Sequence, residues 1–87
     1  MNNKFKREIY VGGGERLLSL LGNFDENLNA IIAETGAEAY ANGETIVISG
    51  EEAAVELTVI VINKLLEIID AGERIDKSRI IYCVELA

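Results

Sequence analysis

The chain has 87 residues, which is enough for one compact domain. Hydrophobic residues make up 49% of the sequence and charged residues 26%, a composition typical of a globular rather than a disordered chain. Lys and Arg number 8 against 15 Asp and Glu, and the net charge of −7 argues against a domain that mainly binds a phosphate backbone. The absence of His and the single Cys exclude a metal centre built from these residues and an internal disulfide.

The two ends of the sequence give expectations about location. Residues 1–7 are partly basic but have no apolar stretch behind them, so they do not form a signal peptide. The longest nearly unbroken apolar run, Val59 to Ile62, is far shorter than the ~20 residues that span a bilayer. We therefore expect a cytoplasmic protein with no membrane partner, in which Cys83 is a reduced, buried thiol. The ending at Ala87 fits both a natural C-terminus and a chain cut before a second domain.

The first part of the chain predicts a strand and then a short helix. Phe5–Val11 shows the alternation of a strand, and Gly12–Gly14 form a flexible joint behind it. A two-turn helix follows over Glu15–Leu21 and ends at Gly22. The apolar face of this helix is predicted to consist of Leu17, Leu18 and Leu21.

A second helix starts within three residues of the first. Asn23 is its predicted N-cap, with Glu26 as the capping-box partner, and Gly36 ends it. The side chains that we expect to face the core are Leu28, Ile31 and Ile32. The two helices are therefore joined by a very tight turn over Gly22–Asp25.

A hairpin and the longest helix come next. Two alternating segments flank Asn42-Gly43, a dipeptide that tolerates positive φ and predicts a two-residue hairpin turn. Ser49 and Glu52 form a predicted capping box for a helix over Glu51–Ala71. The β-branched run inside this helix has strand propensity, but a polar stripe at helical spacing favours the helix. That stripe comprises Glu52, Glu56, Asn63, Glu67 and Asp70.

The last segment, Asp76–Ala87, is predicted to be a helix, although Ile80–Val84 is also consistent with a strand. The predicted order is β-α-α-β-β-α with an extra C-terminal helix. We therefore expect an α+β fold in which helices cover one face of a three-stranded antiparallel sheet.

Catalytic motifs find no support in these residues. Gly12–Gly14 is followed by Glu15 and Arg16 rather than by the Lys and hydroxyl of a nucleotide-binding loop, and Leu17 stands where the dinucleotide pattern needs a third Gly. Without His, no nucleophile–base pair can be assembled, and the carboxylates are expected to form a solvated acidic surface. We predict that this chain is not an enzyme and holds no cofactor or metal of its own.

The stretch Leu20–Ala37 resembles the core of K-homology (KH) domains of type I. The family spacing apolar-apolar-G-x-x-G-x-x-apolar-x-x-I-x-x-x-T-G-A is matched at Gly22, Leu28, Ile31, Thr35, Gly36 and Ala37. In that family the G-x-x-G turn places backbone N–H groups against nucleic-acid phosphates. Asp25 replaces the second Gly in this chain, and a carboxylate at a helix N-terminus repels a phosphate. The loop of the predicted hairpin, which forms a wall of the groove in KH domains, also has the minimum length.

Residues 8–87 as a whole are similar to the N-terminal region of PhoH-like proteins. The most specific piece is Gly22–Leu28, which reads G-N-F-D-E-N-L. The resemblance implies a cytoplasmic, phosphate-starvation-associated ATPase linked to RNA metabolism, which would bind ATP and Mg²⁺ beyond Ala87. On this basis we divide the chain into an N-terminal arm (1–7), a KH-like domain (8–72) and a C-terminal segment that leads toward the ATPase domain (73–87).

Two functions follow from these observations. In the first, the degenerate turn binds single-stranded RNA weakly, and Phe24 either stacks on a base or packs as a plug of the helix turn. The predicted contacts are Gly22, Asn23, Phe24, Asp25 and Arg16, with Lys4, Lys6 and Arg7 as further cations. In the second, the scaffold has lost RNA binding and contacts a protein partner, its own ATPase domain or a second copy. Apart from Asp25 and the net charge, this function is supported by surplus apolar surface on the long helix, namely Val59, Leu66 and Ile69.

Overall fold

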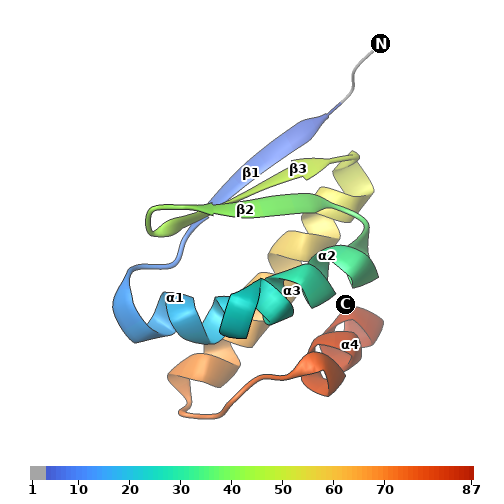
Figure 1. The fold of residues 1–87 in the computed structure, drawn as a ribbon. Coiled ribbons are helices and arrows are strands. Elements are labelled where there is room, and N and C mark those ends of the chain that lie inside the picture. Colours follow the sequence, from blue (N-terminus) through green and yellow to red (C-terminus); the bar gives the residue numbers. More distant parts are fainter. Residues whose placement is uncertain (1–3) are drawn as a thin grey trace.

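The structure is a computed structural model that describes residues 4–87, so residues 1–3 of the predicted N-terminal arm lie outside the described residues. Strands and helices follow the predicted order, including the extra C-terminal helix (Figure 1). The elements are β1 (Phe5–Tyr10), α1 (Gly14–Leu21), the short 3-10 helix η1 (Asn23–Asp25), α2 (Glu26–Thr35), β2 (Glu38–Asn42), β3 (Thr45–Gly50), α3 (Glu52–Asp70) and α4 (Lys77–Leu86). The strand alternative for Ile80–Val84 is therefore wrong.

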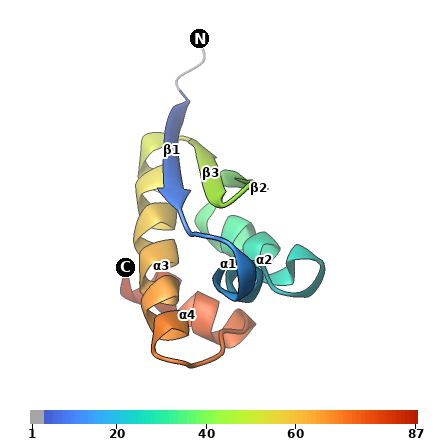
Figure 2. The same cartoon turned by 90° about the vertical axis from the view of Figure 1, so that its left-hand side faces the viewer.

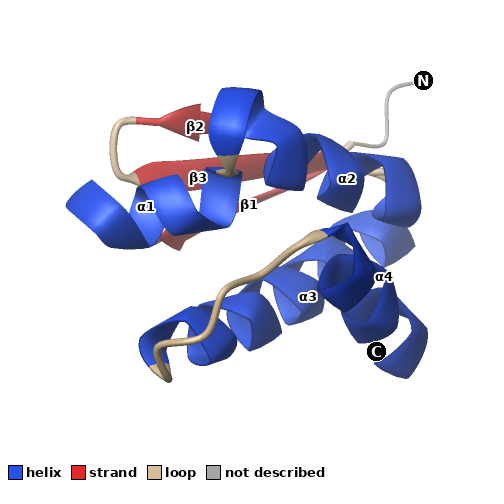
Figure 3. Ribbon diagram, turned by 60° about the horizontal axis from the view of Figure 1, so that its bottom comes forward, coloured by secondary structure: helices blue, strands red, loops and turns tan. Residues whose placement is uncertain are grey.

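The sheet is antiparallel, with the strand order β1-β3-β2. Phe5 pairs with Gly50, so the part of the predicted arm from Phe5 onward belongs to β1. The helices lie on one face of the sheet, as predicted (Figure 2). α3 packs against β1 and β3, and α2 packs against β2, whereas α4 packs against α2 and α3 (Figure 3).

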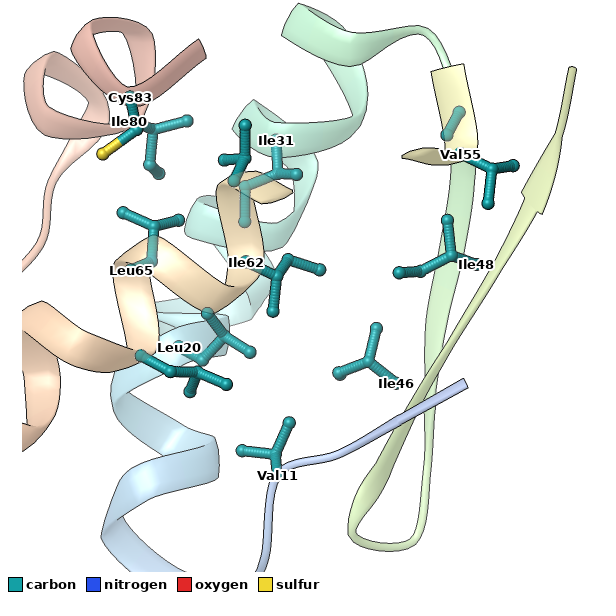
Figure 4. Packing of buried hydrophobic residues seen from close by; sticks show 13 residues of the cluster. Val11, Leu20, Ile31, Ile46, Ile48, Val55, Ile62, Leu65, Ile80 and Cys83 are labelled. Atoms are coloured by element: carbon teal, nitrogen blue, oxygen red, sulfur yellow. The ribbon is translucent and has the colours of Figure 1, made fainter. Parts of the chain in front are cut away.

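The core lies between the sheet and these helices. Ile46 and Ile48 of the central strand are fully buried, because alternate residues of a strand point to the same face. They face Leu20 and Ile62 from the helices (Figure 4). Cys83 of α4 is buried and free, and burial raises the pKa of its thiol.

The buried face of α1 differs from the prediction by one residue. Leu20 is completely buried, whereas Leu18 is 66% exposed. Leu17 and Leu21 pack partly against the core. The three inward residues follow the i, i+3, i+4 spacing of a helix face, and Leu18 falls outside that stripe.

Neither predicted capping box forms. Asn23 belongs to η1, and α2 begins only at Glu26. Ser49 is a residue of β3 that pairs with both neighbouring strands, so it is not placed at the end of α3. By contrast, the side chain of Asp76 accepts a hydrogen bond of 2.9 Å from the backbone N–H of Arg79 and so caps α4.

The hairpin turn is also displaced by one residue. Asn42 pairs with Thr45 and extends β2, so the two loop residues are Gly43 and Glu44 rather than Asn42 and Gly43. Gly43 has a φ of 62°, and Glu44 is not among the residues with positive φ. A positive φ at the first loop position only is the requirement of a type II′ turn, which Gly satisfies.

The three apolar residues singled out on α3 are largely covered within the domain. Leu66 is only 5% exposed, and Val59 and Ile69 are partly buried against the core. α1 and α4 both pack against α3, which explains why this helix is apolar around most of its circumference. No helix within residues 4–87 is long and apolar enough to cross a membrane.

Candidate contact site at the turn between α1 and α2

The turn between α1 and α2 has an unusual backbone. Gly22 has a φ of 77°, Phe24 of 53° and Asp25 of 60°. Phe24 and Asp25 are the non-glycine residues with positive φ among residues 4–87. The left-handed region costs an L-residue roughly 1–2 kcal/mol, with Asp tolerated better than most. Such outliers cluster at functional sites, which directs attention to this turn.

Gly22 is required by a close neighbour. A Cβ atom at this position would lie 2.8 Å from both Cγ and Nδ2 of Asn27. Asn27 is only 8% exposed and donates a hydrogen bond of 3.2 Å to the backbone carbonyl of Ser19. Asn27 thus links α2 to α1 beneath the turn. The sequence interpretation missed this residue, for which the only signal was a polar side chain beside the predicted core residue Leu28.

Phe24 and Asp25 both point to solvent. The exposure of Phe24 is 101%, so the alternative in which its ring plugs the helix turn is wrong. Asp25 occupies the N-cap position of α2, but its side chain accepts no hydrogen bond from the first turn of that helix. The structure therefore presents an aromatic ring next to a carboxylate that makes no capping contact.

Arg16 is engaged within the domain. Its Nε and Nη2 donate hydrogen bonds of 2.9 Å to the two carboxylate oxygens of Asp70, and Nη1 donates one of 2.8 Å to the carbonyl of Val11. These hydrogen bonds hold the pKa of Asp70 below its usual range and raise the pKa of Arg16. Arg16 lies near the turn, but its guanidinium already binds a carboxylate.

The other cations named from the sequence are not gathered at the turn. Lys4 pairs with Glu38 at 3.1 Å, and Arg7 pairs with Glu56 at 3.1 Å. Arg7 and Lys6 lie in β1, which makes no contact with α1, η1 or α2. The structure thus places Arg16 in one groove lining with Gly22 and Asn23, and it leaves the cations of β1 elsewhere.

A groove of about 640 Å³ lies beside the turn, between α1 and the α3–α4 loop. Its lining contributes four carboxylates against two guanidinium groups. These charged residues are Glu15, Glu26, Asp70, Glu73, Arg16 and Arg74. The surroundings of the turn are therefore acidic. Within residues 4–87, no cluster of three or more His, Cys, Asp or Glu side chains is placed to hold a metal ion.

Comparison with known proteins finds one significant similarity. The whole chain is 29% identical over 87 residues to a protein described as PhoH-like protein from Bacillus subtilis (strain 168), and it spans 25% of the length of that relative. No protein-family model matches the chain, and no solved structure matches it significantly. The similarity supports a PhoH-associated domain, in agreement with the resemblance at Gly22–Leu28.

Proposed function

We propose that the chain is an accessory domain of a PhoH-like ATPase and that it contacts protein through the turn over Gly22–Asp25. The observation that carries this proposal is Phe24, whose ring is fully exposed on a backbone with a φ of 53°. A strained, exposed aromatic residue gains nothing from packing within the domain. Aromatic anchors of this kind dominate the binding energy of many protein interfaces.

The charges around the turn favour protein over nucleic acid as the main partner. Asp25 and Glu26 adjoin Phe24, the neighbouring groove is acidic, and the guanidinium of Arg16 is bound to Asp70. Nucleic-acid binding draws its affinity mainly from cations that neutralise phosphates. The acidic turn opposes that interaction, whereas a protein partner needs only a pocket for the ring.

Weak binding of single-stranded RNA by a KH-like turn is the second candidate function. It is favoured by the helix N-terminus of α2, where the side chain of Asp25 accepts no hydrogen bond from the first turn, although the N–H of Glu26 itself donates to the carbonyl of Asn23. Such N–H groups bind phosphate, and the ring of Phe24 offers a face for base stacking. In this function Asp25 weakens the contact, and Arg16 contributes little because Asp70 already neutralises its charge.

A single-tryptophan variant tests the two functions together. The chain contains no Trp, so Phe24→Trp places one fluorescent reporter at the turn, and Tyr40→Trp is the matched control on the sheet. The reporter is titrated in two separate experiments. One uses the three quarters of the Bacillus subtilis relative that the chain does not match, and the other uses an oligouridylate. We expect the emission of the tryptophan introduced by Phe24→Trp to shift to the blue with protein, and to change little with RNA at physiological salt.

The control at Tyr40 is expected to stay unchanged in both titrations. Strong quenching by RNA without a response to protein would support the second candidate instead. A reporter that responds to neither would contradict a contact role for the turn.

A further inference from the structure

The structure has an apolar groove between α3 and α4 that was not predicted from the sequence. It has a volume of about 400 Å³, and its apolar lining comes from both helices. Ile60 of α3 is 54% exposed and Tyr82 of α4 is 61% exposed. Burial of large apolar side chains stabilises a folded chain, so two such side chains left open on adjacent helices indicate a contact surface.

The charges on this groove are opposite to those of the protein as a whole. The net charge of the chain is −7, yet the charged side chains that line the groove are Lys64 and Arg79. Both cations lie close enough to lower the pKa of the Cys83 thiol against the larger effect of burial. Lys64 also approaches Glu67 at 3.8 Å, and Arg79 approaches Glu73 at 2.6 Å. Each cation has further donors for a partner.

The turn between α1 and α2 carries the complementary chemistry. The exposed ring of Phe24 is followed directly by the exposed carboxylates of Asp25 and Glu26. Within residues 4–87, neither carboxylate forms an ion pair. An apolar cavity of about 150 Å³ already accepts a benzene ring, so a groove of about 400 Å³ admits the phenyl ring of Phe24.

We propose that a second copy of this chain occupies the groove, with its Phe24 ring between α3 and α4 and its Asp25 and Glu26 facing Lys64 and Arg79. This inference rests on the proposed contact role of the turn and names the partner. The turn and the groove are different surfaces, so the contact is heterologous and copies join head to tail. One aromatic anchor and two charge contacts make a small interface, and association is therefore weak.

Sedimentation velocity over a concentration series tests the proposal. The wild-type chain is expected to associate with rising concentration. Phe24→Ser and Ile60→Glu are each expected to weaken association by about tenfold or more, because one removes the anchor and the other adds a repelling charge to the groove. Tyr40→Ser, a matched change of an exposed aromatic residue on the sheet, is expected to leave association unchanged. Thermal melts confirm that each variant is folded.

Mixing the two weakened variants provides the decisive measurement. Phe24→Ser retains the groove and Ile60→Glu retains the turn, so the mixture is expected to form a one-to-one complex that does not grow further. A wild-type chain that stays monomeric at every concentration, association in either variant that is as strong as in wild type, or a mixture that fails to pair would overturn the proposal. The wild-type chain could fail to self-associate while the tryptophan emission of Phe24→Trp still shifts when the unmatched part of the Bacillus subtilis relative is added. In that case the proposed contact function of the turn stands, but its partner is not a second copy.

Discussion

Arg16 and Asp70, 54 residues apart in the sequence, face each other through two hydrogen bonds of 2.9 Å. This arrangement joins α1 to the last residue of α3, and the bond from Arg16 to the carbonyl of Val11 adds the segment after β1. A bidentate pair fixes orientation better than a single contact. The pair therefore positions α1, and with it the turn at Gly22.

Removing the charge of Asp70 is expected to destabilise the fold in a pH-dependent way. Arg16 holds the pKa of Asp70 below its usual range, so the stabilisation is complete above the unfolded pKa of about 3.9 and is lost as pH falls through the lower folded pKa. Urea unfolding of Asp70→Asn should thus show a lower midpoint than wild type at neutral pH, and the difference should shrink below about pH 4. Glu67→Gln, at a looser exposed pair, is the control. A difference independent of pH would contradict the charge argument.

Gly22→Ala is expected to lower the free energy of unfolding by about 2 kcal/mol, because it combines a φ of 77° with a contact of 2.8 Å to Asn27. Adding Asn27→Ala should restore part of this loss by removing the clashing atoms, while the backbone strain remains. Chemical denaturation of both variants measures the difference. An unchanged midpoint for Gly22→Ala would show that the turn rearranges freely.

Phe24→Gly is expected to raise the free energy of unfolding by up to about 1 kcal/mol. Gly adopts a φ of 53° without steric cost, and the fully exposed ring gives up no packing. Phe24→Ala is the matched control, because it removes the ring but keeps a Cβ on the left-handed backbone. Equal stability of the two variants would exclude strain at this residue.

Asp25→Gly is expected to strengthen binding of single-stranded RNA, because it removes the carboxylate at the N-terminus of α2. Fluorescence anisotropy with a labelled oligonucleotide at low salt should show weak binding by wild type and a gain of roughly a few-fold in the variant. Asp25→Asn removes the charge but keeps the side chain, so it separates the charge from backbone freedom. Tight binding by wild type, or no gain in Asp25→Gly, would refute this role of Asp25.

Two buried hydroxyl groups are expected to differ in importance. Thr58 contacts Thr35 at 2.8 Å, and Thr35 donates a hydrogen bond of 2.8 Å to the carbonyl of Ile31 and accepts one from the N–H of Ala37. Thr58→Val keeps the shape and leaves those bonds of Thr35 intact, so it should cost about 1 kcal/mol. Thr35→Val leaves the buried N–H of Ala37 without its acceptor and should cost more, about 1–3 kcal/mol. The reverse order in thermal or urea unfolding would contradict this assignment.

Much of the secondary structure could be predicted because its signals are local. The end of α1 at Gly22 and the run of β-branched residues in β3 depend on neighbours within a few residues. Neither predicted capping box, at Asn23 or at Ser49, forms. For Ser49 the reason is non-local. Ser49 pairs with β1 and β2 on either side, and these ladder contacts extend β3 past the predicted helix start.

The candidate site could also be predicted from the sequence only in part. The G-N-F-D-E-N-L motif located the turn, and its glycine and tight spacing required an abrupt change of direction. The full exposure of Phe24 and the engagement of Arg16 by Asp70 could not be read from the motif. The Arg16–Asp70 pair depends on where α3 lies relative to α1, and η1, which carries Phe24, contacts only α1 and α2 among the elements of residues 4–87.

The sequence by itself determined the order of elements, the acidic balance and the position of the turn, since each is a property of residue types and short-range spacing. Only the tertiary structure decided which surfaces remain open. Leu66 is only 5% exposed, whereas Ile60 of the same helix is 54% exposed and lines a groove together with Tyr82, although all three are large side chains suited to a core. Exposure depends on contacts between segments far apart in the chain, and residue type alone does not specify those contacts.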